Sequence, residues 1–202
     1  MAIWNIVFDI GNVLADYRWE GYLQDKGFSP EMIARSAKAS TLNPAWNEYD
    51  RGVLTSEEVV ELFVRNDPGI EKELHFAFDS LAGIIRPLDY SVAFVRSLKA
   101  AGYHAYYLSN YSQRAWEDCP DGMPFLPEMD GGIFSYRVQL IKPDPAIYRL
   151  LLSRYGLKAE ECVFLDDRAD NVEGARRVGM QGIVFRSPEQ ALDELRRLGV
   201  TI

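Results

Sequence analysis

The sequence predicts an α/β fold, in which a doubly wound, mostly parallel sheet carries a small α-helical insertion. Short apolar runs, each ending in a polar cluster, alternate with helical patterns along most of the chain. This alternation is typical of buried parallel strands joined by crossover helices. Residues 16–86 break the alternation, because they contain helical patterns and no strand-like run. A length of 202 residues allows one domain with such an insertion.

Four strong apolar runs predict the buried strands of the sheet. They cover residues 3–8, 104–108, 162–165 and 182–185, and a weaker run covers residues 132–135. Because ligands bind at the carboxyl ends of the strands in open α/β sheets, the polar residues that follow these runs are the candidates for a site.

Helical patterns fill the intervals between the later strands. They cover residues 92–101, 144–155, 171–178 and 188–198, and a Gly follows each of them. The second pattern has Pro145 near its start and Gly156 after its end, which is the punctuation that helices prefer. These patterns predict the crossover helices of the core.

The interruption between residues 16 and 86 predicts a helical insertion. It contains helical patterns at residues 30–39 and 56–64, and Thr55 or Ser56 with Glu58 gives the second pattern an N-terminal capping sequence. We therefore divide the chain into an α/β core of residues 1–15 and 87–202 and a helical cap of residues 16–86.

Charge and composition exclude some partners. The formal net charge is -8, so the basic surface that binds nucleic acid or an anionic membrane is missing. No apolar run approaches the length of a membrane span. Cys119 and Cys162 are far apart in the sequence and predict two reduced thiols. We expect a cytoplasmic protein that is a monomer or a weak homodimer and acts on a small molecule.

Functional side chains follow three of the strong strands, and a lysine precedes one of the core helices. They are Asp9, Ser109 with Asn110, Lys142, and Asp166 with Asp167. A carboxylate can attack phosphorus and split a difficult hydrolysis into two easier steps. Because two anions must then approach each other, a hard cation with oxygen ligands is needed. This set of residues therefore predicts metal-assisted phosphoryl transfer.

The residue types predict a role for each member of the set. Asp9 is the predicted nucleophile and a ligand of Mg²⁺, and Asp166 or Asp167 supplies further oxygen ligands. Of this pair, Asp166 is our first choice for direct coordination. Lys142 neutralises charge and holds the nucleophile beside the phosphoryl group.

Two neighbouring residues are predicted to bind the phosphoryl oxygens. The hydroxyl of Ser109 and the backbone N–H of Asn110 can donate hydrogen bonds as charge develops in the transition state. The same residue types are also typical of a helix cap, and a phosphate site at a helix N-terminus would combine the two roles.

The residues resemble the haloacid dehalogenase-like (HAD) hydrolase superfamily, whose four motifs are found here in order. The matching segments are residues 8–14, 108–110, 142–145 and 164–175. The resemblance implies a Rossmann-like core, a small cap between the first two motifs, and Mg²⁺-dependent hydrolysis through an aspartyl phosphate. The first and fourth segments are similar to a bacterial branch that includes an α-glucose-1-phosphate phosphatase.

One position departs from the family pattern. Phosphatases of the family carry a second Asp two residues after the nucleophile as general acid and base, and here that position is Gly11. The family also uses the backbone carbonyl at this position as a metal ligand, which Gly11 still provides. Asp16 is a candidate substitute acid and base. Good leaving groups, such as a sugar 1-phosphate, depend least on the missing acid.

We therefore expect a Mg²⁺-dependent phosphatase that acts on a small phosphorylated metabolite, with sugar phosphates favoured. One alternative is a 2-haloacid dehalogenase, which tolerates the residue at Gly11 but has no need of the pair Asp166 and Asp167. A second alternative is a non-catalytic phosphate-binding or regulatory protein, supported by Gly11.

Overall fold

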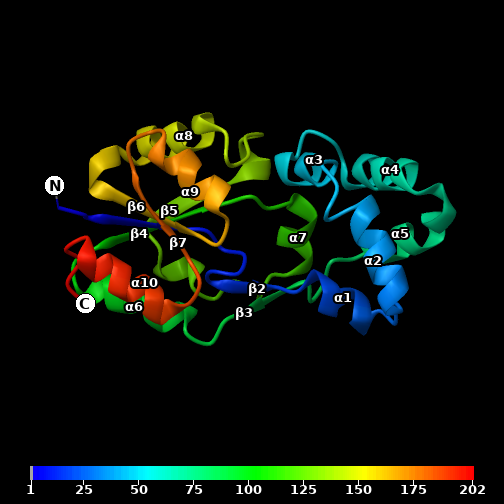
Figure 1. Ribbon diagram of the computed structural model, residues 1–202, viewed down its shortest axis with the longest axis horizontal. Coiled ribbons are helices and arrows are strands. Elements are labelled where there is room, and N and C mark those ends of the chain that lie inside the picture. Colours follow the sequence, from blue (N-terminus) through cyan, green and yellow to red (C-terminus); the bar gives the residue numbers. More distant parts are fainter. Residues whose placement is uncertain (1) are drawn as a thin grey trace.

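The computed structural model describes residues 2–202, in which a five-stranded parallel sheet forms the centre of the molecule (Figure 1). The strands stand in the order β5-β4-β1-β6-β7. They are β1 (Asn5–Phe8), β4 (His104–Ser109), β5 (Gly131–Phe134), β6 (Cys162–Asp166) and β7 (Gln181–Val184). Each corresponds to a predicted apolar run, and the predicted fold class is confirmed.

Strand β1 lies at the middle of the sheet, between β4 and β6. Phe8 stands opposite Tyr107 on one side and Leu165 on the other. Every residue of β1 and β6 is buried, because helices cover both faces of the sheet. That double cover explains why these strands are continuous apolar runs without alternation. The parallel pairing of β1 with β4 and β6 brings the carboxyl ends of the three strands to one edge.

Two pairs of helices cover the two faces of the sheet (Figure 1). Helices α6 (Ser91–Ala100) and α10 (Pro188–Arg197) lie on one face, and α8 (Pro145–Tyr155) and α9 (Ala169–Arg176) lie on the other. The predicted core helices are all present. Helix α8 begins at Pro145, with Asp144 accepting a hydrogen bond from the Ala146 N–H at 2.8 Å.

Five helices lie together beyond the carboxyl edge of the sheet, on the side away from the two ends of the chain (Figure 1). We call them the cap helices: α1 (Trp19–Asp25), α2 (Pro30–Ala39), α3 (Trp46–Arg51), α4 (Ser56–Asn66) and α5 (Glu71–Phe78). Four aromatic side chains pack together among them: Trp46, Tyr49, Phe63 and Phe78. A capping box between Thr55 and Glu58 starts α4.

A short antiparallel ribbon joins the cap helices to the core. It consists of β2 (Ala15–Tyr17) and β3 (Ile85–Pro87), with Tyr17 opposite Ile85. The prediction that residues 16–86 contain no strand is therefore wrong. Three-residue strands are too short to show an alternating pattern, so nothing in the sequence marked them. The division of the chain at these residues stays a prediction.

Short elements complete the chain between the main helices and strands. They are α7 (Gln113–Asp118) and the 3₁₀ turns η1 (Pro68–Ile70), η2 (Leu126–Glu128), η3 (Ser135–Arg137) and η4 (Ala159–Glu161). Within residues 2–202, no helix combines the length and the apolar character that crossing a bilayer requires. Cys119 and Cys162 are buried free thiols.

Candidate active site

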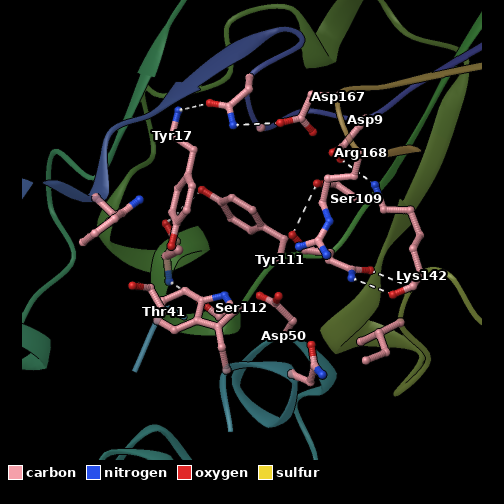
Figure 2. Close-up of a pocket in the computed structure, with 18 of the residues that line it drawn as sticks. Asp9, Tyr17, Thr41, Asp50, Ser109, Tyr111, Ser112, Lys142, Asp167 and Arg168 are labelled. Atoms are coloured by element: carbon pink, nitrogen blue, oxygen red, sulfur yellow. Dashed lines mark hydrogen bonds and ion pairs between the residues drawn. The ribbon is translucent and has the colours of Figure 1, made fainter. Parts of the chain in front are cut away.

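The predicted site residues come from three neighbouring strand ends. Asp9 directly follows β1, Ser109 is the last residue of β4, and Asp166 is the last residue of β6. The Asp9 N–H donates to the carbonyl of Leu165 at 2.8 Å, which extends the pairing of β1 with β6 by one residue. A cavity of about 560 Å³ opens at this edge, between the sheet and the cap helices (Figure 2).

Lys142 connects two of the carboxylates at the base of this cavity. Its ammonium lies 2.8 Å from Asp9 Oδ1 and 2.6 Å from Asp166 Oδ2. The residue is 3% exposed. A charge of this kind is stable in the interior only when it is paired, and here it has two anionic partners. The structure therefore brings the predicted lysine, the predicted nucleophile and one of the late carboxylates together.

The charges in this cluster change one another's protonation. Burial alone would lower the pKa of Lys142, but the charges of Asp166 and Asp9 outweigh it and the pKa is raised. Burial raises the pKa of Asp9 to about 7; Lys142 opposes the shift and Asp166 adds to it. Lys142 is therefore an ammonium, and its charge favours the carboxylate form of Asp9 that a nucleophile requires.

Asn110 holds Lys142 in place through the backbone. Its side-chain oxygen accepts a hydrogen bond from the Lys142 N–H at 2.8 Å, and its side-chain nitrogen donates to the Lys142 carbonyl at 3.1 Å. The prediction gave Asn110 a phosphate-binding backbone N–H, and the structure adds this positioning role for the side chain. Ser109 is buried, and both residues line the cavity.

Three carboxylates can bring oxygen atoms together as a metal site does. One oxygen each of Asp9, Asp166 and Asp167 lies within 4.8 Å of the others. Carboxylate oxygens are the ligands that hard divalent cations such as Mg²⁺ prefer. Burial raises the pKa of Asp167 against the opposing effect of its hydrogen bond with Asn12. A cation would relieve the repulsion among these buried anions, so the donor set fits Mg²⁺.

The two late aspartates differ in how far their oxygens are already bound. Asp166 is fully buried, and its carboxylate accepts hydrogen bonds from Lys142, from the Arg168 N–H at 2.8 Å and from Asn171 Nδ2 at 3.0 Å. Asp167 is less buried and lines the cavity. The carboxylate of Asp166 is thus largely bound within the cluster and contacts Lys142, whereas that of Asp167 lines the cavity. Direct coordination by Asp166 stays a prediction.

The loop after the nucleophile carries Gly11 and Asn12. Gly11 lines the cavity, and a Cβ atom at this position would meet Tyr17 Cβ at 3.7 Å, an ordinary contact. Asn12 has a φ of 57° and donates from its side chain to Asp167 Oδ2 at 3.0 Å. Its side-chain oxygen accepts from the Tyr17 N–H at 3.3 Å. Asn12 thus ties β2 to the acidic cluster, a role that no sequence pattern indicated.

Asp16 does not occupy the position that a substitute acid requires. It is exposed and lies outside the set of residues that line the cavity, whereas its neighbour Tyr17 lines it. Successive side chains of a strand point to opposite faces, and in β2 the inward face belongs to Tyr17. The suggestion that Asp16 replaces the acid at Gly11 therefore has no support in the structure.

A different carboxylate, Asp50, lines the cavity from the cap helices. It lies on α3, is 9% exposed, and is directed into the same cavity as Asp9 and Lys142 (Figure 2). Burial raises the pKa of Asp50 to about 7, with Lys142 opposing the shift and Asp9 adding to it. Sequence reasoning missed Asp50, because nothing in its local pattern separates it from Glu48 on the same helix.

The cap side of the cavity is largely apolar. Its aromatic and aliphatic lining residues are Tyr17, Trp19, Leu42, Trp46, Leu81, Ile84 and Ile85. Two hydroxyls interrupt this lining, those of Tyr17 and Thr41, and both are buried without a hydrogen-bond partner in residues 2–202. Unpartnered polar atoms in a cavity are natural contacts for a ligand, because burying them without a partner costs stability.

Comparisons with known proteins identify a family and several relatives of the chain. Residues 5–179 match the family described as haloacid dehalogenase-like hydrolase. A sesquiterpene phosphatase of Aspergillus oryzae is 25% identical over 193 residues, which are 95% of this chain and 94% of that protein. A drimenol cyclase of Aspergillus calidoustus is 25% identical over 96% of this chain, which spans only 36% of the cyclase.

A solved structure shares the fold. It is a HAD family enzyme of Bacteroides thetaiotaomicron in complex with magnesium and inorganic phosphate. The TM-score is 0.70 at 20% identity, and the match covers 92% of this chain and 95% of the other. The similarity extends over the core and the cap helices alike.

Proposed function

The chain belongs to the haloacid dehalogenase-like hydrolase family, and from this premise we propose that it is a magnesium-dependent phosphatase with Asp9 as nucleophile. One observation carries the proposal. The buried Lys142 ammonium stands between Asp9 and Asp166, and Asp167 completes an acidic group at the base of a cavity. A carboxylate beside a lysine and further oxygen ligands is suited to attack on a phosphate ester.

The ligands for the cation would come from two distant parts of the sequence. Asp9 and Asp167 would hold Mg²⁺ through carboxylate oxygens, and Gly11 would add its carbonyl. When bound, the cation neutralises the phosphoryl charge and lets two anions approach each other. The protein's own contribution is the fixed position of these ligands, which Asn12 supports through its hydrogen bond to Asp167.

The chemistry then follows from the positions of the side chains. A carboxylate oxygen of Asp9 attacks phosphorus, the bond to the leaving oxygen breaks, and Asp9 becomes an aspartyl phosphate. Lys142 orients Asp9 and offsets the negative charge, and the Ser109 hydroxyl donates to a phosphoryl oxygen. Arg168 also lines the cavity and adds a second positive charge. Water then attacks phosphorus, which releases phosphate and restores Asp9.

The acidic group favours phosphatase chemistry over dehalogenation. Displacement of a halide from carbon has no phosphoryl charge to offset and gives the cavity-lining carboxylate of Asp167 no task. The cavity also favours catalysis over simple phosphate binding, since its volume of about 560 Å³ greatly exceeds that of a phosphate ion. A leaving group must fill the remainder.

The lining of the cavity supports a leaving group with both apolar surface and hydrogen-bonding atoms. Aromatic and aliphatic side chains would pack against the apolar surface of the leaving group. The hydroxyls of Tyr17 and Thr41 would form hydrogen bonds with its polar atoms. The name of the Aspergillus oryzae relative refers to a sesquiterpene substrate, and an apolar lining suits such a group. We propose a screen that covers hexose 1-phosphates, flavin mononucleotide and isoprenoid monophosphates, each with Mg²⁺.

A direct assay tests the activity. With Mg²⁺ the protein is expected to hydrolyse p-nitrophenyl phosphate, and EDTA is expected to stop the reaction. Asp9→Asn should lose activity by more than a thousandfold, because the amide is a poor nucleophile. Asp16→Asn is the matched control, since it removes an exposed carboxylate outside the cavity and should keep the activity of the unaltered chain.

The same assay separates the alternatives. Release of chloride from 2-chloropropionate without metal, with no phosphate released from any ester, would establish dehalogenation instead. An active Asp9→Asn protein would refute the nucleophile.

A further inference from the structure

Departure of an alkoxide from phosphorus requires a proton at the leaving oxygen, and the cavity holds few groups that can give one. Tyr17, Tyr111 and Lys142 hold their protons too tightly, since the pKa of each is raised. The side chains of His75 and His104 are exposed, and neither lines the cavity. Among the described residues that line it, the carboxyls are the remaining candidates.

Three carboxyls line the cavity, and two of them already have tasks in the proposed function. Asp9 is the nucleophile, and Asp167 lies in the acidic group suited to the cation. Asp50 is the third. It lies outside that group and enters the cavity from α3, whereas Asp9 and Asp167 enter from the sheet (Figure 2).

The position of Asp50 suits the leaving-group side of phosphorus. In phosphoryl transfer the attacking and leaving oxygens stand roughly in line, on opposite sides of phosphorus. Asp9 attacks from the carboxyl edge of the sheet, so the leaving oxygen is directed toward the cap helices. Asp50 lies on α3, one of the cap helices, and reaches into the cavity from that side (Figure 2).

Asp50 has no ion-pair partner that would explain its burial. Within residues 2–202, no Lys, Arg or His nitrogen lies within 4.0 Å of its carboxylate, although Asp9 and Asp166 both pair with Lys142. Burying a carboxylate without such a partner costs stability. A buried, unpaired acid directed into a cavity is typical of a functional group rather than a structural one.

The backbone around Asp50 is tied to the core. The Ser135 hydroxyl donates to the Asp50 carbonyl at 2.6 Å and accepts a hydrogen bond from the Tyr111 N–H at 2.8 Å. Helix α3 ends at Arg51 and is capped by Gly52, whose φ of 69° is left-handed and which lies against Tyr136. These contacts join the cap helix to the loops after β4 and β5, so the carboxyl keeps a fixed place above the site.

We propose that Asp50 is the general acid and base of the reaction, an assignment that rests on the proposed phosphatase function. In the first step the Asp50 carboxyl gives its proton to the leaving oxygen as the P–O bond breaks and Asp9 becomes phosphorylated. In the second step the Asp50 carboxylate takes a proton from the attacking water as the bond from phosphorus to Asp9 breaks. Asp50 ends each cycle protonated, as it began.

The electrostatics around Asp50 suit both steps. Burial raises the pKa of Asp50 to about 7, so the acid and the base form are both populated near neutral pH. The shift results from opposing neighbours on several elements. Those that lower the pKa are Lys142, Arg168 and a hydrogen bond from Trp46, and Asp9 raises it. Three tyrosines also face the same charge: Tyr17, Tyr49 and Tyr111.

The test measures how the rate depends on the leaving group. The substrates are 2,4-dinitrophenyl, 4-nitrophenyl and phenyl phosphate, whose leaving groups increase in basicity in that order. With saturating Mg²⁺, Asp50→Asn is expected to lower kcat/KM for phenyl phosphate by about 10²–10⁴-fold and to change that for 2,4-dinitrophenyl phosphate far less. Glu48→Gln, the same kind of change on α3 but outside the cavity, is expected to leave all three rates unchanged.

A second signature follows from the second step. Without the base, the aspartyl phosphate accumulates, so Asp50→Asn is expected to release one equivalent of dinitrophenolate per enzyme in a burst before a slow phase. A partly unfolded variant would lower every rate by the same factor and leave the dependence on leaving group unchanged. Asp50→Ser, a smaller neutral replacement, is expected to give the same dependence as Asp50→Asn.

The outcomes separate the two proposals. An equal fall in kcat/KM for all three esters, with no burst, would show that Asp50 only binds substrate or supports the cap helices, and would overturn its role in proton transfer while the phosphatase function stands. If the unaltered chain hydrolyses none of the esters, the phosphatase function and the role of Asp50 fail together.

Discussion

The side chain of Lys142 is stable in the interior only because Asp9 and Asp166 surround it. Removal of one partner from a buried ion pair typically costs about 3–5 kcal/mol, since the remaining charges stay buried without compensation. We expect Lys142→Met to lower the free energy of unfolding by about this amount at pH 8. The loss should be smaller at pH 5, where Asp9, with its raised pKa, is protonated.

Urea unfolding in EDTA at the two pH values measures this loss. Lys158→Met is the control, because Lys158 pairs with Glu161 at the surface and should contribute little. An equal loss for both variants would contradict the idea that the buried cluster depends on its lysine.

Asp50 predicts a dependence of stability on pH. Its pKa is 3.8 in the unfolded chain and about 7 in the folded one, so the folded protein holds the extra proton between these values. The stability from this proton is complete below about pH 4 and is lost as pH rises through 7. One pKa unit corresponds to about 1.4 kcal/mol, so the total is on the order of a few kcal/mol.

Asp50→Asn has no proton to lose in this range. As pH rises from 5 to 8, the unaltered chain should lose the part of its free energy of unfolding that comes from this proton, and the variant should not. The difference in free energy of unfolding between the two should therefore shift in favour of the variant. Urea midpoints measured in EDTA at both values test this, and a difference that stays constant with pH would show that burial of Asp50 does not shift its protonation.

Gly11 leaves room for a side chain at the position where related phosphatases carry an acid. A Cβ there would make an ordinary 3.7 Å contact with Tyr17, and the φ of Gly11 is not left-handed. We expect Gly11→Asp to fold with little change in Tm. In the Asp50→Asn background it should restore part of the rate with phenyl phosphate, because it returns a carboxyl to the cavity. Failure to restore any rate in a folded double variant would contradict this interchangeability.

Among the elements, those with strong local patterns could be predicted. The strands of the sheet are buried on both faces and therefore read as apolar runs, and α8 is bounded by Pro145 and Gly156. The ribbon of β2 and β3 could not be predicted, since each strand has three residues and depends on its partner for its conformation. Helices α1 and α3, of seven and six residues, are likewise too short to show a period.

The end of α3 is an element whose geometry bears on the site. A Cβ at Gly52 would lie 2.9 Å from Tyr136 Cα, a backbone atom that cannot move away cheaply, and the φ there is 69°. We expect Gly52→Ala to destabilise the protein and to lower kcat/KM for phenyl phosphate, because the replacement would displace α3 and Asp50 with it.

Gly27→Ala is the matched control for this prediction. Gly27 also has a left-handed φ, of 83°, but a Cβ there meets nothing within 4 Å. Gly27→Ala should therefore lower the free energy of unfolding by about 1 kcal/mol through backbone strain and leave the activity unchanged. Equal effects of the two substitutions on activity would show that the position of α3 does not matter for the reaction.

At the scale of the whole molecule, the site joins residues from the ninth position to the hundred and sixty-seventh. The part contributed by strand ends could be predicted, since parallel strands bring Asp9, Ser109 and Asp166 to one edge by topology. The part contributed by the cap helices could not, because the direction of Asp50 depends on how α3 docks on η3. No local pattern encodes that contact.

Mg²⁺ should stabilise the whole fold if the acidic group binds it. A ligand at a hundred times its Kd adds about 2.7 kcal/mol to the free energy of unfolding. For a chain of this size, that corresponds to a rise in Tm on the order of 5–10 °C. Asp167→Asn should remove most of the rise, whereas Asp170→Asn, an exposed neighbour outside the acidic group, should keep it. An unchanged rise in Asp167→Asn would place the ion elsewhere.

The β2–β3 ribbon has a consequence for how such a protein can change over evolution. The chain departs from the core at Ala15 and comes back at Pro87, and these two residues are register partners. A segment of another length or shape could replace residues 16–86 without a change in the sheet or in the position of Asp9. The residues that contact the leaving group could thereby change while the residues that carry out the reaction keep their positions.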